Sequence, residues 1–312
     1  MIDNKICLQI ADITCSVASA DPFAELRIEG ATQNFLIPEI DPDITIETRW
    51  SDLSGIKYEG PKLFDSGALW QLRRVDGVFL FSFSSEVFGP IPYKVALFKK
   101  NFSMGEVLLH RPYFNTDQSL TPLGYPLDEL LFTNFLALGR GVEVHACGVT
   151  DSQGRGHLFV GQSTAGKTTI AILWENEPDI TVLSDDRIIL RRIENKIWMY
   201  GTPWHGEAML GSPSRAPLTA VYFLEKGQKN KLISQKASDS ISRLFTCSFP
   251  PFYNRDALDF TLGFLEDVVK NVPCYELKFT PDKSVVEFIK GERFTRLRQK
   301  APCGSTGRNG ER

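Results

Sequence analysis

A glycine-rich motif, Gly161-Gln-Ser-Thr-Ala-Gly-Lys-Thr-Thr169, constrains the fold more than any other feature of the sequence. It fits the pattern GxxxxGK[ST], follows the apolar segment 158–160, and opens a helical pattern over about 167–177. A strand, a glycine-rich turn and a helix in this order are typical of a loop that binds phosphate. The alternative is a strand–helix turn that binds nothing, but it leaves the Lys167-Thr168 pair unexplained.

The chemistry of phosphate binding accounts for the spacing of this motif. Gly161 and Gly166 let the backbone wrap a phosphate with its N–H groups turned inward, and the helix directs its positive end at the anion. Lys167 is expected to reach the β- and γ-phosphates of ATP, and Thr168 to bind Mg²⁺. The residues predicted to bind the nucleotide are Gly161, Gln162, Ser163, Thr164, Ala165, Gly166, Lys167, Thr168 and Thr169.

Two adjacent carboxylates, Asp185 and Asp186, end the next strand pattern, at 180–185. Beside a phosphate loop, one such carboxylate can hold Mg²⁺ and the other can accept the proton of an attacking hydroxyl. A solvated turn is the alternative, and the motif upstream favours the functional interpretation. Only 18 positions separate Lys167 from Asp185, which predicts a compact variant of the phosphate-loop fold.

Three further groups are candidates for the same site. His145 lies on the predicted strand before the loop strand, although a lone strand histidine is more often a packing residue. The turn-rich segment 201–207 ends in Glu207, a possible ligand of Mg²⁺, or is a rigid turn with Trp204 packed on the core. The arginines that could neutralise the transferred phosphate are Arg187, Arg191, Arg215, Arg243 and Arg255, and the sequence does not choose among them. For Arg187 and Arg191, a solvated strand face is the more usual explanation.

Composition argues against several classes of protein. The 35 basic and 38 acidic residues give a net charge of −3, which argues against binding nucleic acid through bulk charge. No apolar run approaches the roughly 20 residues that cross a bilayer, and charges interrupt any leader, so we expect no membrane association. The six cysteines are scattered without CxxC spacing, which predicts reduced thiols in a cytoplasmic protein.

The pattern changes near Thr121. Residues 1–120 predict a β-rich N-terminal domain, because segment 44–50 alternates apolar with polar residues and 68–85 reads as two strands around a DG turn. Residues 121–300 mix strands with helices and are expected to form a second domain, so the fold class is α+β or α/β. Residues 301–312 predict a disordered tail.

The elements expected in the second domain follow from periodicity and breakers. They are helices within 127–138, 167–177 and 254–271, strands at 142–149, 157–161, 180–185, 218–227 and 274–279, and a hairpin around Glu194-Asn195.

In this order, His145, the loop and the segment LSDDR (183–187) resemble the HPr kinase/phosphorylase family, which is related in fold to the phosphoenolpyruvate carboxykinases. The resemblance covers roughly residues 140–280 and implies a compact HPr-kinase-like phosphate-loop domain. More narrowly, YGTPWHGE (200–207) and CYELKFTPD (274–282) look like bacterial HPr-kinase-like proteins, which are thought to phosphorylate seryl hydroxyls.

The resemblance implies roles for single residues. Asp186 would be the general base, His145 would sit beside it, and Lys167 would bind the β- and γ-phosphates. The metal ligands implied are Thr168, Asp185 and Glu207. The loop has Thr164-Ala165 where HPr kinases carry a glycine-rich run, and the N-terminal domain differs from theirs, so the acceptor stays open.

These observations predict a kinase that uses ATP and Mg²⁺ to phosphorylate a seryl or other alcohol hydroxyl of a protein, peptide or small molecule. The first alternative is a non-catalytic ATP-binding module that regulates a partner protein through the N-terminal domain. A mechanical phosphate-loop ATPase is a third, less favoured interpretation. Relatives of HPr kinase form oligomers, so a homo-oligomer is possible.

Overall fold

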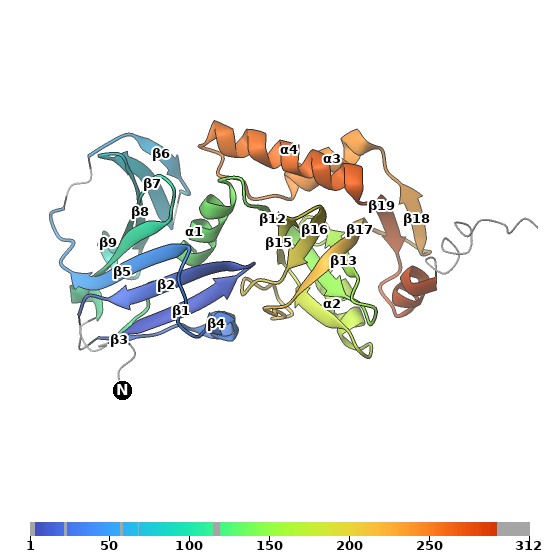
Figure 1. Ribbon diagram of the computed structural model, residues 1–312, viewed down its shortest axis with the longest axis horizontal. Coiled ribbons are helices and arrows are strands. Elements are labelled where there is room, and N and C mark those ends of the chain that lie inside the picture. The colour runs from blue at the N-terminus through green and yellow to red at the C-terminus, as the bar shows by residue number, and fades with distance from the viewer. Residues whose placement is uncertain (1–3, 22–23, 57–58, 68, 115–118, 292–312) are drawn as a thin grey trace, which may run out of the picture.

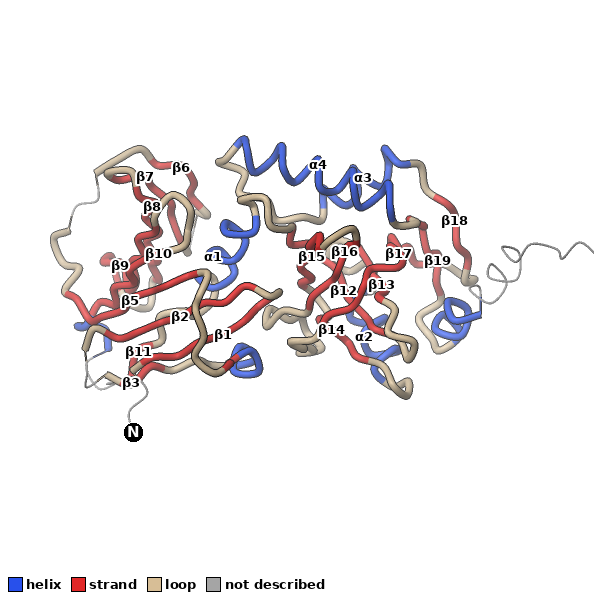
Figure 2. The backbone as a smooth tube through the Cα atoms, in the orientation of Figure 1, coloured by secondary structure: helices blue, strands red, loops and turns tan. Residues whose placement is uncertain are grey.

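The computed structural model of the chain describes residues 4–21, 24–56, 59–67, 69–114 and 119–291. Its strands form two large sheets, with helices between and beside them (Figure 1, Figure 2). The mixed α/β content expected from the sequence is confirmed. The tail predicted at 301–312 lies outside the described residues.

A nine-stranded sheet, in the order β4-β1-β2-β5-β10-β9-β8-β7-β6, dominates the first part of the chain. Neighbouring strands are antiparallel except that β5 runs parallel to both β2 and β10. The strands are β1 (Lys5–Ile10), β2 (Ile13–Ser19), β4 (Leu36–Ile37), β5 (Ile44–Ser51), β6 (Lys62–Asp65), β7 (Trp70–Val75), β8 (Val78–Ser85), β9 (Gly89–Phe98) and β10 (Met104–His110). Shorter elements beside them are β3 (Glu25–Leu26), η1 (Gly30–Phe35), η2 (Arg111–Phe114) and β11 (Ser119–Leu120).

Local sequence explains much of this sheet. In β5, Ile44 and Ile46 are buried while Thr45 and Glu47 are exposed, as period-2 alternation requires. The turn between β7 and β8 places Asp76 and Gly77 at φ of 47° and 82°, a conformation that a two-residue hairpin turn needs. The hairpin predicted over 68–85 is therefore confirmed.

The second sheet has eight strands, in the order β13-β12-β15-β16-β17-β19-β18, with β14 paired to β12. β13 also pairs in parallel with β17, so that five of the strands close into a ring. The strands are β12 (Val142–Thr150), β13 (Gly156–Val160), β14 (Thr181–Ser184), β15 (Arg187–Ile193), β16 (Lys196–Tyr200), β17 (Arg215–Lys226), β18 (Lys231–Ser234) and β19 (Cys274–Phe279).

The sheets are accompanied by the helices α1 (Leu127–Leu136), α2 (Lys167–Glu175), α3 (Ala237–Thr246) and α4 (Arg255–Asn271). A further helical stretch covers 284–291, at the end of the described residues. α2 packs on β12, β13 and β14, and α3 packs along α4 beside the second sheet (Figure 1). α1 lies between the two sheets, and its buried Leu131 and Phe135 join the apolar core of the nine-stranded sheet.

The sequence prediction missed α3, the helical stretch 284–291 and, among the longer strands, β1, β2, β6, β10 and β18. α3 carries an apolar stripe of Ile241, Leu244 and Phe245, but its serines and charges mask the pattern. Among the described helices, none combines the length and apolar character needed to cross a bilayer.

Candidate active site

The phosphate-loop motif connects β13 to α2, as its pattern predicts. Gly166 precedes the helix with φ of 105°, and a Cβ at this position would lie 2.6 Å from the ring of Phe279. Both facts require glycine. The first N–H groups of α2 have no partner within the helix, so this end of the loop can accept an anion.

A pocket of about 380 Å³ opens at the loop. The loop and α2 line it with Ser163, Thr164, Gly166, Lys167, Thr168 and Thr169. Four side chains reach it from elsewhere in the chain, namely His145, Asp186, Glu207 and Lys226. Gly161, Gln162 and Ala165 line a neighbouring pocket with Arg243. The pocket therefore gathers His145, Asp186 and Glu207 beside the loop, as the sequence analysis expected, although their roles stay predictions.

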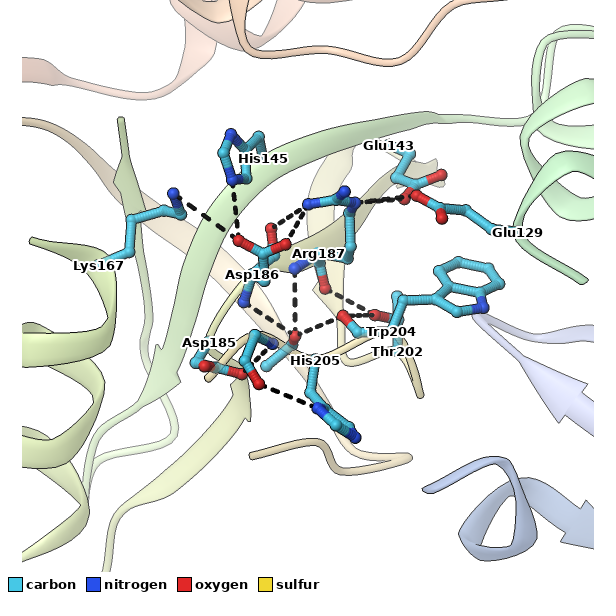
Figure 3. A network of polar contacts seen from close by, with 12 residues as sticks. Glu129, Glu143, His145, Lys167, Asp185, Asp186, Arg187, Thr202, Trp204 and His205 are labelled. Atoms are coloured by element: carbon cyan, nitrogen blue, oxygen red, sulfur yellow. Dashed lines mark hydrogen bonds and ion pairs between the residues drawn. The ribbon is translucent and has the colours of Figure 1, made fainter. Parts of the chain in front are cut away.

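Asp186 is the centre of a polar network in this pocket (Figure 3). Its Oδ1 accepts a hydrogen bond from His145 Nε2 at 2.8 Å and lies 3.8 Å from Lys167 Nζ. Its Oδ2 pairs with the Arg187 guanidinium. Burial alone would raise the pKa of Asp186, but the hydrogen bond with His145 and the two neighbouring cations outweigh it and lower the pKa. The carboxylate is therefore held ionised.

Lys167 is buried at the floor of the pocket and donates to the Gly161 carbonyl at 3.0 Å. Burial lowers its pKa, and Asp186 only partly offsets this. A phosphate group would bring negative charge to this partly desolvated ammonium. The arrangement fits an anion bound at the loop.

Arg187 links the pocket to α1. Its Nε donates to Glu129 at 2.9 Å and lies 3.6 Å from Glu143, and its guanidinium stacks over Phe249 at 4.3 Å. Burial, and then the charge of Glu129, raise the pKa of Glu143 well above its ordinary value. Arg187 is thus fixed between Asp186 and Glu129, rather than on a solvated strand face.

Asp185 points away from the pocket. Its side chain is buried, and its Oδ1 and Oδ2 accept the backbone N–H groups of Gly206 at 2.8 Å and Ala208 at 3.0 Å. A Cβ on Gly206 would lie 2.8 Å from Oδ2, which explains the glycine at this position. In this structure Asp185 anchors the segment that carries Glu207, whereas the resemblance implies a metal ligand.

The segment 201–207 combines the two interpretations that its sequence allowed. Trp204 is buried in the core and donates its indole N–H to Asp128 on α1 at 2.9 Å. Glu207, three residues later, lines the pocket. A rigid turn therefore presents a carboxylate to the site.

The side chains around the loop offer oxygen atoms, which are the ligands that Mg²⁺ prefers. Thr168, Asp186 and Glu207 supply oxygen atoms to the same pocket, and Mg²⁺ is usually held by one or two carboxylates together with waters and substrate phosphates. No set of three or more His, Cys, Asp or Glu side chains in the described part of the chain could hold a metal ion alone. The donors therefore fit a metal that arrives with a nucleotide.

Lys226, at the end of β17, was missed by the sequence analysis, because nothing local distinguishes it from a surface lysine. The other arginine candidates do not line the pocket that holds Lys167 and Asp186, and Arg191 donates to the Arg140 carbonyl at 3.1 Å. Arg215 pairs with Asp12, Arg243 with Glu276, and the exposed Arg255 lies 3.9 Å from Asp259. Of these arginines, Arg187 is the one bound to Asp186.

No protein-family model and no curated protein matches this chain. Among solved structures, 81 chains match. One of them is the HPr(Ser) kinase/phosphatase from Coxiella burnetii, with 11% identity over 51% of this chain and 99% of that chain. The TM-score of this match is 0.29, so it shows at most a distant relationship in fold.

Proposed function

We propose that this protein is a phosphotransferase that uses Mg²⁺-ATP to phosphorylate an alcohol hydroxyl. One observation carries the proposal: an ionised carboxylate, Asp186, shares a pocket with the phosphate loop and Lys167. A turn that bound nothing would not need to bring a carboxylate and a histidine from distant strands to the same place.

In the proposed reaction, the acceptor oxygen forms a bond to the γ-phosphorus while the bond from that phosphorus to the ADP oxygen breaks. The hydroxyl proton passes to Asp186, and the electron pair of the broken bond leaves with ADP. Lys167 and the N–H groups at the start of α2 stabilise the charge on the phosphoryl oxygens. Mg²⁺, when bound with the nucleotide by Thr168 and Glu207 or Asp186, would neutralise further charge.

The lowered pKa of Asp186 bears on its role. A general base works best when its pKa lies near the working pH, so Asp186 is a weak base. In phosphoryl transfer the transition state is loose and little proton transfer is needed early, so positioning carries most of the effect. His145 and Arg187 hold the two carboxylate oxygens in place, and Asp186 therefore acts first by orienting the hydroxyl.

The test is transfer of label from γ-labelled ATP in the presence of Mg²⁺. Three acceptor pools are offered: free serine with small alcohols, short serine-containing peptides, and a host protein extract. A labelled product that disappears in Lys167→Ala supports the proposal. ATP binding without labelled product in any pool contradicts it.

A nucleotide-sensing module is the second candidate, and one contact favours it. Trp204, on the segment that carries Glu207, is hydrogen-bonded to Asp128 on α1, which packs into the core of the nine-stranded sheet. In this candidate function, nucleotide binding at the pocket would change the conformation of the nine-stranded sheet through this contact. Partner binding that changes with ATP, without phosphorylated product, would favour this candidate.

A further inference from the structure

A second pocket, of about 250 Å³, lies between α1, the segment 249–253 and the edge of the nine-stranded sheet. The sheet contributes Phe64 of β6 and Trp70 of β7, whose rings stack at 4.8 Å. The segment 249–253 contributes Phe249 and Phe252. We call this the aromatic pocket.

The aromatic pocket shares a wall with the pocket at the phosphate loop, which we call the phosphate pocket. Arg187 lines the aromatic pocket and binds Asp186 in the phosphate pocket. Phe249 also lines it, and its ring lies 6.0 Å from the His145 ring, which lines the phosphate pocket. The two spaces are therefore separated by about one layer of side chains.

The lining of the aromatic pocket is mostly apolar, and its charged side chains neutralise each other. Its charged lining residues, Glu129 and Arg187, are paired with each other at 2.9 Å. A charged ligand group would have to compete with this ion pair, whereas an apolar group gains from the aromatic walls. The pocket therefore fits an uncharged apolar group.

The rim of the aromatic pocket is open. Tyr125 is 65% exposed and Phe252 is 61% exposed, so both leave apolar surface in contact with water. A free small molecule usually buries most of its surface in its site. A pocket that covers one side chain and leaves the rest outside suits a residue of a longer chain, and burial of these exposed rings would add to its binding.

We propose that the acceptor is a peptide segment in which the hydroxyl residue lies at Asp186 and a neighbouring bulky apolar side chain fills the aromatic pocket. The proposal rests on the proposed function and names its substrate class. The rings of His145 and Phe249, one lining each pocket, lie 6.0 Å apart, and an extended chain advances about 3.3–3.6 Å per residue, so we place the apolar side chain one or two residues from the hydroxyl residue. The nine-stranded sheet then supplies part of the specificity site through Phe64 and Trp70.

The experiment measures kcat/KM for label transfer from γ-labelled ATP to capped alanine peptides with one central serine. A single phenylalanine is placed in turn one or two residues before or after the serine, and free serine is a separate arm. We expect one position to raise kcat/KM about 10- to 100-fold over the peptide with alanine throughout, the range for apolar groups in a fitted pocket. Free serine should be a poorer acceptor than the best peptide.

Variants at the exposed rim connect this preference to the pocket. Phe252→Ala should reduce the ratio between the best phenylalanine peptide and the alanine peptide by about fivefold to tenfold, and Phe252→Leu should retain most of it. Leu262→Ala, at an exposed apolar residue of α4 that does not line the pocket, is the matched control and should leave the ratio unchanged.

The outcomes separate this inference from the proposed function. Equal rates for all peptides, free serine as the best acceptor, or equal effects of Phe252→Ala and Leu262→Ala overturn the peptide assignment while transfer itself stands. Absence of product in every arm overturns the proposed function and this inference with it.

Discussion

Two regions of this protein each combine a lysine with an aspartate, but their surroundings differ. Lys94 of β9 and Asp128 of α1 act on each other through their charges, and both are 4% exposed. Lys167 and Asp186 lie at the phosphate loop and line an open pocket. Each lysine donates to a loop carbonyl, Lys94 to Pro122 at 3.1 Å and Lys167 to Gly161 at 3.0 Å.

The aspartates of the two pairs respond differently. Burial raises the pKa of Asp128 to about 6, and its hydrogen bond from Trp204 offsets this only in part. Burial also acts on Asp186, but His145 and two cations outweigh it and lower the pKa. Burial alone therefore does not identify a functional carboxylate. Asp186 differs because several partners keep its charge beside a space that a ligand can enter.

The largest effect is expected for Asp186→Asn. The amide can neither accept the hydroxyl proton nor orient the hydroxyl as the ionised carboxylate does, so phosphoryl transfer should fall by about 10³-fold, within the range for general acid–base groups. ATP binding should persist, because Lys167 and the loop remain. Single-turnover transfer and calorimetric ATP titration measure the two effects. Transfer at the wild-type rate would show that Asp186 is not the base.

Lys167→Ala should weaken ATP binding by about 10²-fold, through loss of a charge-assisted contact in a partly desolvated site. The matched variant is Lys94→Met, which removes the other buried lysine and should leave ATP binding near the wild-type value. Calorimetric titration of both variants with Mg²⁺-ATP is the measurement. Equal losses of ATP affinity in the two variants would show that Lys167 and Lys94 do not differ in nucleotide binding.

Asp185→Asn tests the carboxylate next to the proposed base. Its two oxygens accept N–H groups of Gly206 and Ala208, so an amide would turn an NH₂ group against one donor. We expect a loss of about 2–3 kcal/mol in the free energy of unfolding, as for a buried bond to a charged group. Denaturant unfolding measures it, with Asp186→Asn as the control. Unchanged stability with lost Mg²⁺ dependence would make Asp185 a metal ligand.

The smallest effect concerns pH. Burial lowers the pKa of Lys94 to about 8 in the folded protein, against about 10.4 in an unfolded chain. Above pH 8 the unfolded state therefore binds more protons at this site, and stability from this group rises with pH. Relative to Lys94→Met, the wild type should gain about 2 kcal/mol between pH 8 and pH 10. A parallel pH dependence of the two proteins would show that Lys94 is not desolvated.

Much of the fold could be predicted because the signals are local. The turn at Asp76-Gly77, the helix that starts at Lys167 and the strand 274–279 each follow from residues within a few positions of one another. α3 was missed because its serines weaken the amphipathic pattern. Lys226 was missed in the site for a different reason, since its place in the pocket depends on a sheet pairing and not on its neighbours in sequence.

The sequence by itself determined the phosphate loop, because glycine spacing, the Lys167-Thr168 pair and the flanking strand and helix are all contained in one short segment. It also brought Asp185 and Asp186 to the end of a strand. The tertiary structure decided which of the two faces the pocket, because the choice depends on backbone N–H groups more than 20 positions away. It alone brought β6 and β7 beside α1 to form the aromatic pocket, because that contact joins segments whose separation in the chain leaves no local pattern.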